Sequence, residues 1–186
     1  MSTSGADRKD ALFWEREGDA ARCRLCPHHC LIKDGMFGIC RVRQNIGGSL
    51  KAMSYGMVSS VHLDPLEKKP LFHFRPGEPV LSFGGLSCNL RCQHCQNFSI
   101  AQVGLEDGAS RYVRSEEVPE MCLRARSMGV AWTYNEPTIW YEYMVEASRL
   151  CRERGLFTVS VTNGYINEAP LRSLKGVIDA MNIDVK

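Results

Sequence analysis

The side chains best suited to chemistry in this sequence are cysteines, and most of the 9 fall into two groups of short spacing. The members of the two groups are Cys23, Cys26, Cys30 and Cys40, and then Cys88, Cys92 and Cys95. The other two, Cys122 and Cys151, stand among apolar neighbours and are expected to be small core residues. Closely spaced thiols in a chain without an export signal are typical of metal centres rather than disulfides.

Three cysteines in one short loop predict a metal centre with an open coordination position. Their spacing is Cys-X3-Cys-X2-Cys, directly after a predicted strand and the pair Gly84-Gly85, which lets the backbone approach a bulky group closely. Each of the four irons of a [4Fe-4S] cluster normally takes one thiolate, so three thiolates leave one iron free to bind another molecule. A zinc loop is the alternative, but zinc usually needs four protein ligands. The spacing therefore favours a [4Fe-4S] cluster on Cys88, Cys92 and Cys95.

This loop resembles the signature of the radical S-adenosylmethionine (radical SAM) superfamily, in which the same spacing follows the first barrel strand. The resemblance implies an enzyme whose cofactors are a [4Fe-4S] cluster and S-adenosyl-L-methionine. It implies reductive cleavage of that cofactor to a 5′-deoxyadenosyl radical, which abstracts a hydrogen atom from an unidentified small-molecule or protein substrate. It also implies an electron donor such as flavodoxin or ferredoxin.

Residues after the later strands resemble cofactor-binding positions of the same superfamily. Glu136 stands where a Gly-Gly-Glu commonly holds the methionine amino group, although this chain has Tyr-Asn-Glu-Pro there. Asn163, in Thr-Asn-Gly, and then Asp184 and Lys186, in Asp-Val-Lys, are similar to strand ends of glycyl-radical activating enzymes. The resemblance implies that these four side chains face the cofactor or the substrate, at the strand ends where barrel active sites form. Ordinary turn and cap chemistry is the alternative.

The N-terminal cysteine group supplies four thiols with intervals of X2, X3 and X9. Four ligands suit a closed tetrahedral zinc site or a second, fully ligated iron–sulfur cluster, and spacing does not choose between the two. Free buried cysteines are the remaining alternative. The sequence thus predicts a second metal site, zinc or iron–sulfur, on Cys23, Cys26, Cys30 and Cys40.

Longer phrases resemble one branch of the superfamily. They are the N-terminal cysteine group, the segment 64–74 (Asp-Pro-Leu-Glu-Lys-Lys-Pro-Leu-Phe-His-Phe) and Cys95-Gln96-Asn97. With them the chain is similar to the radical SAM enzyme of the AmmeMemoRadiSam system, a homologue of pyruvate formate-lyase activating enzyme. Two other functions stay open: an activase for a glycyl-radical enzyme, and a non-catalytic zinc-binding interaction module.

The hydrophobic pattern changes after Pro79 to strands that alternate with helices. Strands are predicted at 80–83, 130–134, 156–161 and 180–185, with helices at 115–129 and 138–154 and a brief one after Asn167. This alternation predicts βαβ units and a parallel sheet, in an α/β fold that resembles a partial (β/α) barrel. A barrel needs more strands, so we expect a sequence truncated after about four strands, with residues missing after Lys186.

The pattern before residue 75 predicts a small Cys-rich β module. Gly47-Gly48 lies between two strand-like runs, as in a tight hairpin, and residues 10–22 are predicted to form a short helix. We therefore expect two domains, a Cys-rich metal-binding module at 1–74 and a radical SAM core domain at 75–186.

Composition narrows the possible partners. The net charge is only +2, which argues against binding to nucleic acid. No apolar run reaches the roughly 18 residues that a membrane helix needs. The first ten residues are polar and lack the apolar segment of a secretory signal. We therefore expect a cytoplasmic protein that does not enter a membrane.

Overall fold

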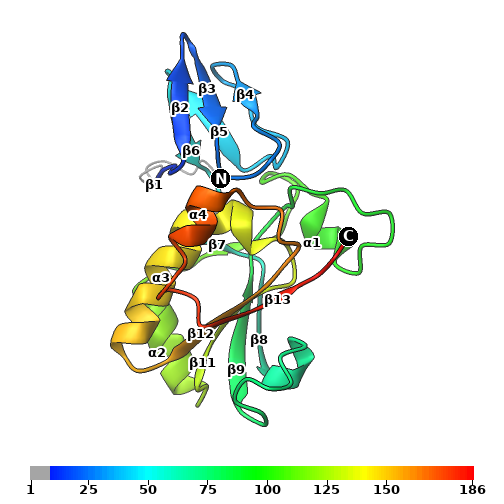
Figure 1. The fold of residues 1–186 in the computed structure, drawn as a ribbon, viewed down its shortest axis with the longest axis vertical. Helices are drawn as coiled ribbons and strands as arrows, with labels where there is room; N and C mark the ends of the chain where they lie inside the picture. The colour runs from blue at the N-terminus through cyan, green and yellow to red at the C-terminus, as the bar shows by residue number, and fades with distance from the viewer. Residues whose placement is uncertain (1–8) are drawn as a thin grey trace.

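A five-stranded mixed sheet forms the centre of the computed structural model, which describes residues 9–186 (Figure 1). The strand order is β13-β12-β11-β9-β8. The four parallel strands are β9 (Pro79–Gly84), β11 (Gly129–Trp132), β12 (Phe157–Thr162) and β13 (Ala180–Ile183). At one edge, β8 (Ser60–Pro65) pairs antiparallel with β9. The predicted α/β class and the four predicted strands are confirmed.

The register of the central strands brings their carboxyl ends level with one another. Ala131 in β11 lies opposite Ser82 in β9 and Val159 in β12. All three strands are almost entirely buried, as expected for parallel strands between two covered faces. Chain segments that follow the strands therefore meet at the same edge of the sheet.

Helices connect the parallel strands, and the two longest lie next to each other along the sheet (Figure 1). These are α2 (Glu117–Arg124) and α3 (Tyr141–Glu153), and α3 packs on β11 and β12. The shorter helical segments are η1 (Leu66–Lys68), α1 (Phe98–Ala101), η2 (Pro137–Trp140) and α4 (Glu168–Arg172). None of the helices in residues 9–186 is both long and apolar enough to cross a membrane. The polar segment 1–8, part of the basis for excluding an export signal, lies outside the described residues.

Of the two longer predicted helices, one agrees with the structure over its whole length and the other is shorter in the structure than predicted. The helix predicted at 138–154 is confirmed as η2 followed by α3, and Gly155 ends it with a positive φ of 73°. The helix predicted at 115–129 is shorter than expected, because α2 ends at Arg124. Ser115 does not cap it, since its Oγ donates to Glu146 Oε1 at 2.7 Å instead.

Three aromatic side chains anchor the carboxyl end of β11 in the core. Trp140 stacks on Tyr143 with 4.6 Å between ring centroids and meets Trp132 edge to face at 5.7 Å. The indole N–H of Trp132 donates to Ser148 Oγ, and that of Trp140 donates to the Ser54 carbonyl. Buried indoles with satisfied N–H groups fix the backbone around them. The segment from β11 into α3 is therefore held rigidly.

The N-terminal part is built from short antiparallel strands. One sheet contains β1 (Lys9–Asp10), β6 (Ser49–Ala52) and β5 (Arg43–Ile46), and another contains β2 (Trp14–Glu17), β3 (Ala20–Cys23) and β4 (Leu31–Ile32). A two-stranded sheet joins β7 (Met57–Val58) to β10 (Arg111–Tyr112). The predicted hairpin at Gly47-Gly48 is confirmed, with φ values of 60° and 78° that suit a two-residue turn.

The helix predicted at 10–22 is wrong, because these residues form strands. Strands β2 and β3 pair as a hairpin that turns at Gly18, whose φ is 59°. In β3 the side chains of Ala21 and Cys23 are buried while those of Ala20 and Arg22 are only half-buried. A burial period of two residues belongs to a strand rather than a helix.

The core sheet crosses the predicted domain boundary between residues 74 and 75. Strand β8 lies before that boundary, yet Leu63 pairs with Leu81 of β9 and Pro65 with Pro79. The Cys-rich segment and the core sheet are therefore joined by a shared strand.

Candidate active site

The segments that follow the parallel strands surround one cleft of about 700 Å³. The predicted site residues that line it are Cys88, Cys92, Cys95, Glu136, Asn163, Asp184 and Lys186. They come from the segments after β9, β11, β12 and β13. In α/β folds the carboxyl ends of parallel strands are the usual place for an active site.

The three cysteines of the cluster loop are half-buried at the edge of the cleft. Burial raises the pKa of Cys88 to about 11, with the charges of Glu136, Cys92 and Cys95 adding to the effect. No three His, Cys, Asp or Glu side chains within residues 9–186 converge at the distances of a single bound ion. A [4Fe-4S] cluster takes one thiolate per iron, so its three ligands have to line one cleft, as these thiols do.

Amide side chains hold the cluster loop in place. Asn135, just after β11, accepts from the Gly85 N–H at 2.9 Å and donates to the Ser87 carbonyl at 3.0 Å. Gln102 donates to the Leu90 carbonyl at 3.2 Å. Ser87 has a left-handed φ of 70°, a conformation that persists only where the surroundings fix it. Sequence reasoning missed Asn135 and Gln102, although an amide directly after a strand end is a usable signal.

Packing within the protein also requires glycine at positions 84 and 85. A Cβ atom on Gly84 would lie 3.0 Å from the ring of Tyr134, and one on Gly85 would lie 3.0 Å from the ring of Trp140. Two aromatic side chains thus pack directly on the backbone where the cluster loop begins.

Glu136 joins the ends of β11 and β12. Its carboxylate is buried and accepts from Thr162 Oγ1 at 2.6 Å, from the Thr138 N–H at 2.8 Å and from the Asn163 N–H at 2.8 Å. Burial raises the pKa of Glu136, against the opposing effect of these hydrogen bonds. A carboxylate has about four acceptor positions, so three bonds leave about one for another donor.

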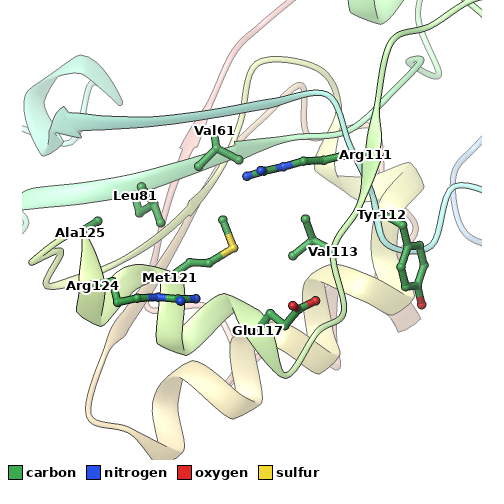
Figure 2. Close-up of a pocket in the computed structure, with 9 residues that line it drawn as sticks. All are labelled: Val61, Leu81, Arg111, Tyr112, Val113, Glu117, Met121, Arg124 and Ala125. Carbon is green, nitrogen blue, oxygen red and sulfur yellow. The ribbon is translucent and has the colours of Figure 1, made fainter.

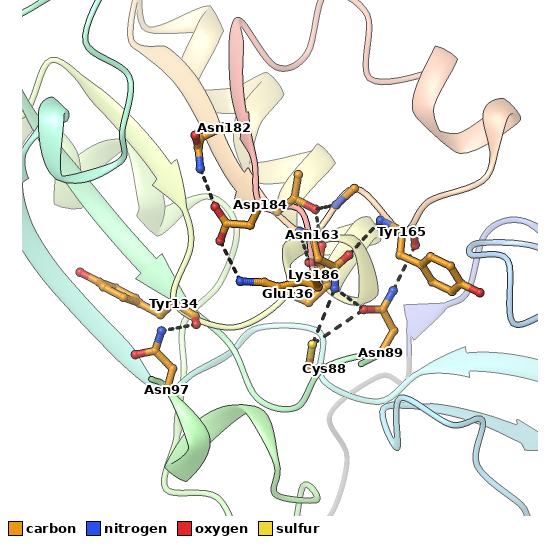
Figure 3. A network of polar contacts seen from close by, with 12 residues as sticks. Cys88, Asn89, Asn97, Tyr134, Glu136, Asn163, Tyr165, Asn182, Asp184 and Lys186 are labelled. Carbon is orange, nitrogen blue, oxygen red and sulfur yellow. Dashed lines mark hydrogen bonds and ion pairs between the residues drawn. The ribbon is translucent and has the colours of Figure 1, made fainter. Parts of the chain in front are cut away.

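Asn163 and Asn89 connect the end of β12 to the cluster loop (Figure 3). Asn163 Nδ2 donates to Asn89 Oδ1 at 2.8 Å and lies 3.9 Å from Cys88 Sγ. Asn89 Nδ2 in turn donates to the Tyr165 carbonyl at 3.1 Å. The predicted residue Asn163 therefore contacts the loop that carries the three cysteines, and Asn89 is a residue that sequence reasoning missed.

Asp184 and Lys186 form an ion pair after β13. Lys186 Nζ lies 3.1 Å from Asp184 Oδ2, while Asn182 donates to the other carboxylate oxygen at 2.8 Å. Burial disfavours the ammonium of Lys186, but Asp184, with a smaller effect of Cys92 and Cys95, raises its pKa above the ordinary value. This ion pair lines the same cleft as the cluster-loop thiols.

The N-terminal cysteines lie in a separate, smaller cavity. Cys23, Cys26, Cys30 and Cys40 all line it, together with Asn89 of the cluster loop. The structure therefore brings the predicted second group together, next to the first.

Another cleft, of about 570 Å³, holds none of the predicted residues (Figure 2). Its wall is formed by Val61, Leu81, Arg111, Tyr112, Val113, Glu117, Met121, Arg124 and Ala125. The lining is mainly apolar, and its charged groups are two arginines and one glutamate. It lacks the thiols that the first cleft provides.

Comparison with known protein families matches residues 85–186 to the Radical SAM superfamily. The matched residues include the three cysteines of the cluster loop and the ends of β11, β12 and β13. The chain therefore belongs to the radical SAM superfamily. Membership implies a [4Fe-4S] cluster and S-adenosylmethionine as cofactors, and the thiols in the open cleft fit that requirement.

Among curated proteins, an uncharacterized protein of Methanocaldococcus jannaschii, MJ0808, is 46% identical to this chain over 179 residues. The match covers 96% of this chain and 53% of the relative. The chain thus spans about half the length of the curated relative that it matches.

Proposed function

We propose that Cys88, Cys92 and Cys95 bind a [4Fe-4S] cluster and that the cleft binds S-adenosyl-L-methionine for hydrogen abstraction from an unidentified substrate. The observation that supports this most is the meeting of three thiols and four strand ends in one cleft of about 700 Å³. When bound, the cluster and the cofactor supply a 5′-deoxyadenosyl radical, which removes the hydrogen atom.

The chain's own contribution is to hold the cluster loop still. The carboxamide of Asn135 ties the loop to the end of β11, and Gln102 ties its centre to the segment after α1. Hydrogen bonds to the backbone that carries the metal ligands fix the orientation of those ligands before the metal binds. The loop therefore presents its thiols from a rigid backbone.

The other predicted residues are proposed to bind the cofactor. Glu136 has one acceptor position left for an ammonium group, and Asn163 stands between it and Cys88. Lys186, raised in pKa and partly exposed, offers a cation for a carboxylate, with Asp184 fixing its position. The methionine part of S-adenosyl-L-methionine carries both an ammonium group and a carboxylate.

The architecture of the core, the branch of the superfamily and the electron donor are further parts of this proposal. We propose a partial (β/α) barrel for the core and membership of the branch that includes the AmmeMemoRadiSam radical enzyme. We also propose that residues 1–74 form a Cys-rich module and that 75–186 form the catalytic core, although β8 bridges the two. A flavodoxin or ferredoxin is the proposed electron donor, and the 9 free cysteines suit the reducing cytoplasm.

The test is anaerobic incubation of the iron-reconstituted chain with S-adenosyl-L-methionine and dithionite, followed by chromatographic measurement of 5′-deoxyadenosine. We expect product that depends on both the protein and the reductant. Cys92→Ala removes one of three ligands and should reduce product to the protein-free level.

Gln93→Ala is the matched control, because Gln93 is exposed in the same loop between two of the ligands. This variant should keep wild-type product formation. Equal product from Cys92→Ala and wild type would contradict the cluster assignment.

A further inference from the structure

Four thiols outside the open cleft share one small cavity in the N-terminal part. The cavity measures about 10 Å³ and is lined by Cys23, Cys26, Cys30 and Cys40. Three of these side chains are buried and Cys30 is half-buried. Thiols from a strand, two turns and a loop have thus been brought to one enclosed place, which chance burial of separate cysteines does not explain.

Local backbone structure holds these thiols near one another. The Cys23 N–H donates to the Cys30 carbonyl at 2.9 Å, and the His29 N–H donates to the Cys26 carbonyl at 3.2 Å. Gly38 is buried where a Cβ atom would lie 3.6 Å from Cys30 Sγ, so the segment leading to Cys40 packs directly on Cys30. Both halves of the group are therefore fixed by contacts outside the thiols themselves.

A buried cation with unused hydrogen-bond donors lines the same cavity. Arg43 is 1% exposed, and its Nε and Nη1 atoms have no hydrogen-bond partner within residues 9–186. Its Nη2 atom lies 3.0 Å from Glu142 Oε1. This ion pair balances the charge of Arg43 but leaves its Nε and Nη1 donors unused. A buried guanidinium with unpaired N–H groups is costly unless an acceptor faces it. Deprotonated thiolates lining the same cavity would supply that acceptor.

We propose that Cys23, Cys26, Cys30 and Cys40 hold a closed, four-thiolate metal centre whose sulfur atoms accept hydrogen bonds from Arg43. No three ligand side chains within residues 9–186 already surround one metal position, so binding has to draw these four side chains together. Zinc and an iron–sulfur cluster share this thiolate chemistry. Each bound thiol gives up its proton on binding, and the metal takes its place.

The centre lies directly behind the cluster loop. His28 Nε2 is 2.7 Å from the Asn89 carbonyl, and the ring of His28 meets that of Tyr165 edge to face at 4.9 Å. Asn167 donates to the Arg24 carbonyl at 2.7 Å from the other side. A metal that fixes the turn at Cys26 thereby fixes the support of the loop carrying the reactive cluster.

The experiment uses the full chain with Cys88, Cys92 and Cys95 all changed to Ala. The four N-terminal thiols are then the cysteine group that is left to bind a metal. Half of the sample is loaded with zinc and half is reconstituted anaerobically with iron and sulfide. Elemental and sulfide analysis should find one zinc ion or one iron–sulfur centre per chain. Absence of metal in both halves overturns the inference.

A second measurement reports the protection of individual thiols rather than the amount of metal. In the same protein, alkylation with iodoacetamide and peptide mass mapping should show Cys26 and Cys30 protected until a chelator is added. Adding Cys26→Ser and Cys40→Ser should abolish metal retention. Metal that persists after both serine changes overturns the ligand assignment. Neither readout requires cleavage of S-adenosyl-L-methionine, so failure of the proposed radical chemistry is detected separately.

Discussion

The two cysteine groups have similarly short spacings but opposite surroundings. The cluster-loop thiols are half-buried and line a cleft of about 700 Å³. The N-terminal thiols are mostly buried around a cavity of about 10 Å³. Reactive metal centres keep a position open to substrate, whereas structural centres close it with protein ligands. Enclosure rather than spacing therefore separates the roles that we assign to the two groups.

The charges beside the two groups differ in the same way. Arg43 and Glu142 each have side chains 2% exposed, whereas at the wall of the open cleft Asp64 is 13% exposed beside Lys69. Tyr134 donates its hydroxyl to Asp64 at 2.9 Å, and Lys69 lies 4.7 Å above the Tyr134 ring. The closed group is next to a fully dehydrated ion pair, and the open cleft is walled by a partly hydrated one.

Metal removal should have the largest effect on stability at the closed group. We expect a chelator to lower the free energy of unfolding of the Cys88→Ala, Cys92→Ala, Cys95→Ala triple variant by about 4 kcal/mol, if free metal before chelation was about 1,000 times the dissociation constant. The reason is that a metal bound only by the folded state adds its binding energy to folding. Urea unfolding with and without chelator measures the difference.

The control for this prediction adds Cys26→Ser and Cys40→Ser to the same background. That protein should unfold identically with and without chelator. A chelator effect that survives these changes would place the stabilising metal elsewhere.

Asn89 is the residue that contacts both groups, so its loss tests whether they are mechanically joined. Asn89→Ala leaves Asn163 Nδ2 without its 2.8 Å partner and the Tyr165 carbonyl without its donor. We expect a loss of about 1–3 kcal/mol in unfolding free energy, because the Asn163 amide and the Tyr165 carbonyl each lose a hydrogen bond away from solvent. We also expect slower formation of 5′-deoxyadenosine, since the loop behind Cys88 is loosened.

Gln93→Ala again serves as the control, as an exposed change in the same loop. If Asn89→Ala lowers stability but leaves the cluster's iron content and product formation unchanged, the two groups are independent.

The parts of the site that could be predicted from sequence are those specified by local order. The intervals among Cys88, Cys92 and Cys95 lie within one loop, and the predicted cofactor residues lie in the short segments that follow β11, β12 and β13. Because the carboxyl ends of parallel strands meet at one edge of the sheet, predicting the strands also predicts that these segments meet. The four strands were predictable for the same reason, since each is a short apolar run between turn residues.

The parts that escaped prediction depend on contacts between distant residues. Asn89 and Asn163 are 74 residues apart, and His28 and Asn89 are 61 apart, so no local pattern indicates either contact. The N-terminal helix was predicted from a few apolar residues among charges, but pairing between β2, β3 and β4 decided the structure. Tertiary pairing overrides weak helix propensity in short segments.

The smallest expected effect concerns the ion pair at the wall of the open cleft. Burial alone would raise the pKa of Asp64, but hydrogen bonds from Lys69 and Tyr134 outweigh it and lower the pKa from 3.8 to about 2. The unfolded chain therefore takes up this proton first as the pH falls. The stabilisation is complete above pH 3.8 and is lost as the pH falls toward about 2.

We expect Asp64→Asn to remove about 1 kcal/mol of this acid-sensitive stability, a value reduced from the full shift because the cleft is partly hydrated. Urea unfolding from pH 4 to pH 2 measures it, as a shallower loss of stability in the variant than in wild type. Asp19→Asn is the matched control, because Asp19 is exposed in the β2–β3 turn. If both variants follow the wild-type curve, Asp64 is not held by Lys69 and Tyr134 in solution. The partly hydrated pair in the cleft would then contribute no more than ordinary surface charges, and the contrast between the two cysteine groups would rest on enclosure alone.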